Sequence, residues 1–112
     1  MKNDGKKNKM TMERFGAWLQ EKTGAEVKEL PGRMECVINI DHIEPSCFAA
    51  LFVVPASRGL LVFELCGWFQ NAAAAWQGLA NREATYPPLL FEEWVGQQYL
   101  TDRGATVERL KV

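Results

Sequence analysis

The side chains with the greatest potential for chemistry are three cysteines and a single histidine. Cys36, His42, Cys47 and Cys66 have the composition of a tetrahedral zinc site with three thiolates and one imidazole. Structural zinc sites bring their cysteines in closely spaced pairs, and this sequence contains no such pair. Because Cys36 also belongs to a run of core-type residues, we expect no metal site and no cofactor.

Cys66 is the best candidate nucleophile. It stands in the stretch "LCGWFQNAAAAW", ahead of an alanine-rich segment with strong helix propensity. A thiol that precedes a helix N-terminus can have a lowered pKa and become reactive. The alternative is that Cys66 ends an apolar strand and only packs there, as most such thiols do.

His42 could act as a general base next to Asp41. However, neighbouring side chains on an extended chain point in opposite directions, so Asp41 does not by itself orient the imidazole. Glycine-rich phosphate loops, H-E-x-x-H helices, G-x-S-x-G elbows and dinucleotide fingerprints are all absent from the sequence. Cys66, His42 and Asp41 therefore remain weak catalytic candidates, and the sequence favours a protein that is not an enzyme.

The charge distribution argues against a nucleic-acid surface. Residues 1–10 contain four lysines and one aspartate, whereas the remainder carries nine basic and thirteen acidic side chains. Phosphate binding relies on clustered Lys and Arg, which an acidic folded body does not offer. We expect residues 1–10 to form a basic, disordered tail and residues 11–112 to form one domain, since a chain of this length supports a single core.

The longest apolar run, residues 48–55, is too short to span a bilayer, and the first residues lack the apolar stretch of a secretory signal. An odd number of cysteines does not suggest a secreted disulfide scaffold. We therefore expect a cytoplasmic protein with reduced, mostly buried thiols and no membrane association.

The chemistry-bearing residues must be positioned by elements that the sequence pattern also indicates. Thr11 can cap a helix that runs to about Thr23 and stops at Gly24. A short strand at 25–30 leads through a Pro31-Gly32 turn into a strand at 33–41, whose alternation predicts one core face and one exposed face. Two mid-helix glycines, Gly16 and Gly96, predict close backbone approach, for example between their two helices.

Two strands, at 48–55 and 60–68, are apolar on both faces and joined by the short linker "ASRG". Such runs predict burial on both faces, and the linker predicts an antiparallel hairpin at the centre of the sheet. Asn71 can cap a helix that ends near Asn81, a further helix begins around Pro88 and ends at Gly104, and residues 105–112 alternate as a final strand. The predicted fold class is α+β, a single domain with a mainly antiparallel sheet of four or five strands packed by three helices, in the order α-β-β-β-β-α-α-β.

Aromatic residues exceed what a small core needs, with four tryptophans and six phenylalanines. Large aromatics dominate interfaces and apolar pockets, and a sheet that is apolar on both faces with few helices to cover it suggests a partner. We take Trp68, Trp76 and Trp94 as candidate ligand- or partner-binding residues, and a homodimer as the expected assembly. The other interpretation is that three helices cover both faces and the tryptophans fill the core.

One distant resemblance extends from Met12 to Ala80. A helix that ends in glycine, the strand "RMECVINID", a second strand, "LLVFELCGWF" and a helix together resemble the first two-thirds of type III secretion chaperones. This resemblance implies a small acidic dimer that binds unfolded segments of other proteins. The stretch from Pro87 to Val112 departs from the strands and helix that should follow in such a chaperone.

Taken together, the sequence favours a small non-enzymatic binding or interaction module, homodimeric, with an aromatic-rich surface or pocket for a protein or an apolar small molecule. The alternatives are a thiol-dependent enzyme or redox-reactive protein centred on Cys66, and a chaperone similar to those of type III secretion.

Overall fold

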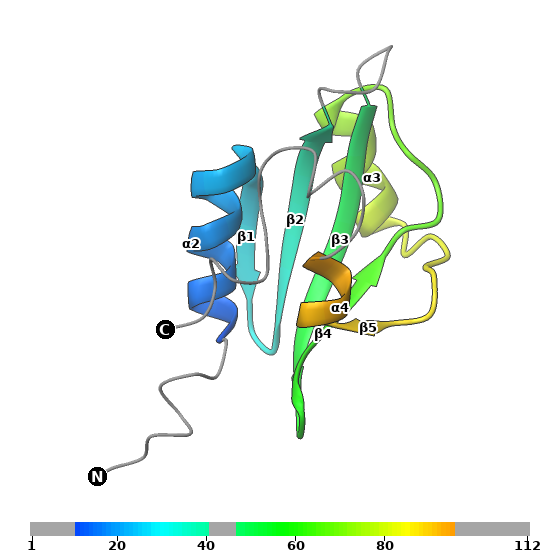
Figure 1. The fold of residues 1–112 in the computed structure, drawn as a ribbon. Coiled ribbons are helices and arrows are strands. Elements are labelled where there is room, and N and C mark those ends of the chain that lie inside the picture. Colours follow the sequence, from blue (N-terminus) through cyan, green and yellow to red (C-terminus); the bar gives the residue numbers. More distant parts are fainter. Residues whose placement is uncertain (1–10, 41–46, 96–112) are drawn as a thin grey trace, which may run out of the picture.

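The first helix, α2 (Met12–Thr23), has the two ends that the sequence predicts. The computed structural model describes residues 11–40 and 47–95 (Figure 1). The Thr11 hydroxyl accepts a hydrogen bond from the Arg14 backbone amide (3.1 Å), which satisfies one of the unpaired amides at the helix start. Gly24 ends the helix in the left-handed conformation, with φ of 70°, which glycine adopts without strain.

The described strands form one antiparallel sheet in which every strand pairs with its neighbours in the sequence. The strands are β1 (Glu26–Leu30), β2 (Arg33–Ile40), β3 (Cys47–Ala56), β4 (Gly59–Glu64) and β5 (Leu89–Leu90). A two-residue turn, Ser57 and Arg58, joins β3 to β4, and Ala56 pairs with Gly59 beside it. The predicted hairpin is thus confirmed, with β3 at the centre of the sheet.

Helices cover the two faces of this sheet unequally. The helices α2 and α4 (Phe91–Val95) lie on one face, here called the front face, and α3 (Ala72–Ala80) lies behind the sheet in Figure 1. The front face carries the larger core, in which Trp94 and Phe15 are fully buried and meet edge to face with ring centroids 5.6 Å apart. The back face has a smaller core beneath α3.

This architecture confirms the predicted α+β fold class, with a five-stranded antiparallel sheet and three helices among the described residues. The segment after Pro88, where the sequence indicated helix, first pairs with β4 as β5 before α4 begins at Phe91. The predicted helix end at Gly104, the final strand at 105–112 and the basic tail at 1–10 lie outside the described residues.

The prediction that β2 exposes one face is wrong. On that face Glu35 is only 8% exposed and Val37 only 2% exposed. The reason is that β2 is an interior strand of the sheet, and Val37 belongs to the core that α3 covers with Ala75 and Leu79. The charge of Glu35 on this face of β2 reflects a partly buried ion pair with Arg33, described below.

Gly16, one of the two mid-helix glycines, has a packing role. A methyl group on Gly16 would lie 2.9 Å from Sδ of Met34 and 3.3 Å from Cγ1 of Val27, so the glycine lets α2 approach β1 and β2. The predicted close approach is therefore seen against the sheet, while Gly96 lies outside the described residues.

No helix within residues 11–40 or 47–95 combines the length and the apolar character needed to cross a lipid bilayer. The cytoplasmic location stays a prediction.

Candidate binding groove

The back face of the sheet is only partly covered, because α3 has nine residues and spans one end of it. Under α3 the back-face residues Val37, Ala50 and Leu65 are buried. Beyond α3, the back-face residues of β3 and β4 are only half-buried, namely Phe52, Val54, Leu61 and Phe63. The sequence predicted that these apolar strands are buried on both faces. The structure differs from that prediction at this open end of the back face.

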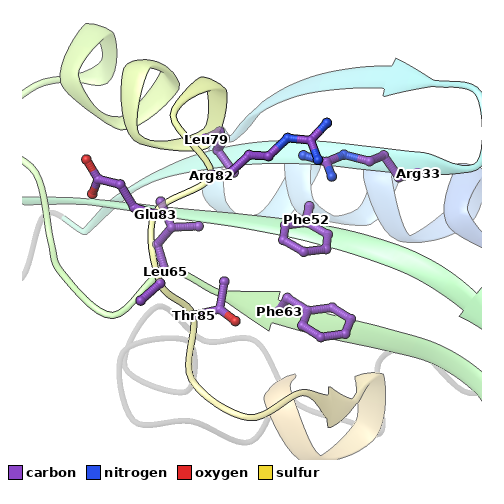
Figure 2. A pocket seen from close by; sticks show the side chains of 9 residues that line it. Arg33, Phe52, Phe63, Leu65, Leu79, Arg82, Glu83 and Thr85 are labelled. Atoms are coloured by element: carbon purple, nitrogen blue, oxygen red, sulfur yellow. The ribbon is translucent and has the colours of Figure 1, made fainter.

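A hollow of about 360 Å³ lies on this open end, between the sheet and the end of α3. We call it the groove and define it by Arg33, Phe52, Phe63, Leu65, Leu79 and the segment 82–85 (Figure 2). Its floor is made by the side chains of β3 and β4. One side is the segment that leaves α3, and the Arg33 guanidinium group lies at another (Figure 2).

Two phenylalanines form the centre of the groove floor. Phe52 and Phe63 are directly opposite each other on β3 and β4, and their rings are stacked with centroids 4.8 Å apart and planes 9° apart. Cross-strand aromatic pairs stabilise a sheet, but here both residues are also only half-buried and line the groove. A flat apolar group could lie against these rings.

Arg33 stands beside this pair and is held by two contacts. Its guanidinium carbon lies 4.4 Å from the centroid of the Phe52 ring, a cation–π arrangement. Its Nε donates to Oε2 of Glu35 (3.1 Å), and its Nη2 contacts the same oxygen. The ion pair explains how Glu35 can be buried with its charge, since a buried carboxylate needs a cationic or hydrogen-bonding partner.

The segment 82–85 is fixed by the way α3 ends. The amides of Arg82 and Glu83 donate to the carbonyls of Leu79 (3.1 Å) and Gly78 (3.2 Å), the pattern of a Schellman motif. This places Arg82 in the left-handed conformation, with φ of 56°, where glycine is the usual residue. Beyond it, Thr85 bridges to Leu65 and so continues the sheet past the end of β4.

The three tryptophans chosen from the sequence lie in three different environments. Trp94 is fully buried in the front-face core, where its Nε1 donates to Oε1 of Glu64 (3.0 Å). Trp76 is half-buried on α3, and its Nε1 donates to Oε1 of Glu26 on β1 (2.6 Å). Trp68 is 46% exposed and follows β4. None of the three lines the groove, and they do not form one surface cluster.

The cysteines also lie apart. Cys36 is buried, and burial, together with the charge of neighbouring Glu35, raises its pKa to about 12. Cys47 is half-buried, whereas Cys66 is exposed, so the expectation of mostly buried thiols is wrong for Cys66. Gly67 and its neighbours turn the chain away from β4 before α3 begins, so Cys66 is not a residue of the helix N-terminus.

His42 and Asp41 lie outside the described residues. Within residues 11–40 and 47–95, no group of three His, Cys, Asp or Glu side chains is arranged to hold a metal ion.

The sequence interpretation missed the groove residues Arg33, Phe52, Phe63 and Arg82. One signal pointed toward them: two strands that are apolar on both faces, with too few helices to cover both. That signal was attributed to tryptophans and a partner subunit. The register that pairs Phe52 with Phe63, and the helix end that brings Arg82 close, depend on the folded chain.

Comparison with known proteins returns no match, whether against protein-family models, curated proteins or solved structures. The chemistry of the groove is therefore the basis for inferring function.

Proposed function

We propose that the protein is a small, non-enzymatic binding module that holds an apolar small molecule in the groove. The observation that carries this proposal is the stacked Phe52–Phe63 pair, which is half-exposed on the uncovered end of the sheet. Leaving two adjacent phenyl rings partly in water forgoes burial that a partner could supply. A bound aromatic or aliphatic group would complete the layer that α3 leaves unfinished.

The dimensions and lining of the groove support a small molecule. Its volume of about 360 Å³ falls at the lower end of the roughly 300–1,000 Å³ that is typical of ligand sites. The lining also has the usual mixture, with an apolar floor from Phe52, Phe63, Leu65 and Leu79 and a few polar groups at the rim. Polar groups at a rim orient a ligand, whereas the floor supplies most of the affinity.

The same lining favours binding over catalysis. Among the described residues around the groove there is no thiol and no imidazole, and no hydrogen bond joins the Thr85 hydroxyl to Glu83, the carboxylate of that lining. The thiol-dependent alternative rests instead on exposed Cys66, which is not a lining residue. A reactive Cys66 would be labelled by a thiol reagent at a lower pH than an ordinary cysteine.

A second copy of the chain is the competing occupant of this face. The residues next to the groove continue its apolar character, because Val54 and Leu61 pair across β3 and β4 and Leu90 pairs with Leu61. All three are half-buried. A homodimer through this face would also satisfy the expectation from the sequence, and it is an outcome that the experiment must distinguish.

The experiment is a titration of the protein with the neutral dye N-phenylnaphthylamine, followed by dye fluorescence. We expect saturable binding, and about a tenfold loss of affinity in the variant Phe63→Leu, which keeps an apolar side chain but removes the stacked ring. The control is Trp68→Leu, the same kind of change at an exposed aromatic outside the groove, which should leave binding unchanged.

Absence of saturable binding to the parent protein would contradict the proposal. So would loss of binding in Trp68→Leu with retention in Phe63→Leu. Sedimentation velocity on the same samples distinguishes the homodimer from a ligand-binding monomer. If the parent protein is a dimer that does not bind the dye, and Phe63→Leu dissociates it, this face binds a second copy of the chain.

A further inference from the structure

The groove carries an excess of positive charge at one side. Arg33 is paired with Glu35, but the Arg82 guanidinium group makes no hydrogen bond or ion pair with any other residue that the structure describes. Figure 2 shows the two guanidinium groups extending toward each other above Phe52, whereas the Glu83 carboxylate points away from them. Two cations therefore face the same space, and a single buried carboxylate serves one of them.

Arg82 also occupies an unfavourable backbone position. With φ of 56° it stands where the Schellman motif favours glycine, and a side chain there is strained. Strained residues persist where the rest of the structure holds them, and they concentrate at binding sites. In this backbone conformation the Arg82 guanidinium group extends from the end of α3 over the groove (Figure 2).

We propose that the ligand of the groove is an aromatic anion, a small molecule whose ring packs against the side chains of Phe52 and Phe63 and whose acidic group lies between Arg33 and Arg82. This proposal rests on the proposed function, because it specifies the charge of the molecule that the groove binds. Guanidinium groups bind carboxylate, sulfonate and phosphate oxygens through paired N–H donors, which give both affinity and orientation.

The two arginines have different parts in this binding. Arg33 is held in place by Glu35 and by the Phe52 ring, so its remaining donors are oriented before the ligand arrives. Arg82 is exposed and brings a second charge that no described carboxylate neutralises. An acidic group between them relieves the repulsion of the two cations.

The test compares two dyes that share one ring system. Anilinonaphthalene sulfonate carries an acidic group, and N-phenylnaphthylamine does not. We expect the sulfonate to bind the parent protein about tenfold more tightly than the neutral dye, the size of effect that a charge-assisted hydrogen bond provides. The variant Arg82→Gln should remove most of this difference and leave the affinity for the neutral dye unchanged, and Arg82→Lys should retain part of it.

The matched control is Arg58→Gln, which removes the same charge from the β3–β4 turn outside the groove and should change neither affinity. Equal binding of the two dyes, or equal loss of both in Arg82→Gln, would overturn the anion proposal while the apolar groove stands. Failure of both dyes to bind the parent protein would overturn the groove itself.

Discussion

At the scale of a single residue, the backbone of Arg82 is expected to lower stability while its side chain contributes to the proposed binding. The variant Arg82→Gly should raise the free energy of unfolding by about 0.5–1 kcal/mol, because glycine adopts the left-handed conformation without strain. Urea unfolding followed by circular dichroism measures the change. Arg82→Ala is the control, since it removes the same side chain but keeps the strained backbone. Its unfolding free energy should be lower than that of Arg82→Gly. Equal stability of the two variants would show that the backbone at this position is not strained.

Cys36 predicts a dependence of stability on alkaline pH. Burial raises its pKa from 9.0 to about 12, so between these values the unfolded chain loses the thiol proton while the folded chain retains it. The folded state is therefore favoured in full below pH 9, and its advantage declines as the pH rises toward 12. The expected result is a steeper fall in urea-unfolding free energy above about pH 9 for the parent than for Cys36→Ala. Parallel curves would contradict it.

At this scale the sequence predicted caps well and site residues poorly. Thr11, Gly24 and Asn71 act within three or four residues of themselves, so their roles follow from local rules. The fate of each tryptophan depends on distant packing, which is why Trp94 proved to be core and Trp68 exposed. The proposed site consists instead of phenylalanines and arginines whose relation is set by strand register and by the end of α3.

The short helix α3 determines how much of the back face is open, and its docking depends on small residues. The Asn71 side chain accepts from the Ala74 amide (2.8 Å) and begins the helix, as the sequence predicts. Ala75 and Gly78 then face the sheet and are buried. Small side chains there let the helix axis approach Leu65 and Phe69 closely.

Gly78→Ala tests this close approach. A methyl group at Gly78 would lie 2.8 Å from Cζ of Phe69 and 3.1 Å from Cδ2 of Leu65, so the helix or the ring must shift. We expect a loss of about 1–3 kcal/mol in unfolding free energy from overpacking, despite the higher helix propensity of alanine. Gly67→Ala is the control, because no atom lies within 4 Å of its added methyl group. Its stability, measured by thermal unfolding, should be close to that of the parent. A stabilised Gly78→Ala would contradict the tight contact.

For the whole molecule, the edges of the sheet bear on self-association. Among the described strands, β1 pairs with β2 alone, so one of its sides is a sheet edge. Three of the five β1 residues are charged, namely Glu26, Lys28 and Glu29. Charged edge strands oppose pairing with another chain. The homodimer expected from the sequence stays a prediction, and this edge does not favour it.

Replacing the two central charges of β1, Lys28→Thr with Glu29→Thr, should allow edge-to-edge pairing. We expect the weight-average mass in sedimentation velocity to rise with protein concentration in this double variant, since threonine favours strands and no longer repels a partner. Lys22→Thr with Glu21→Thr on α2 is the control, because it makes the same change in charge away from the edge. Identical behaviour of the two double variants would show that β1 does not govern association.

The order of strands in the sheet also bears on how the protein reaches its native state. Because β1 to β4 pair in chain order, this part of the sheet can grow by successive hairpins with short connections, whereas α3 lies in the longer connection between β4 and β5. Low sequence separation between contacts is associated with rapid folding. The bond between Trp76 and Glu26 joins residues 50 positions apart and requires β1 and α3 to be in place together. Formation of this bond should therefore be among the last events of folding.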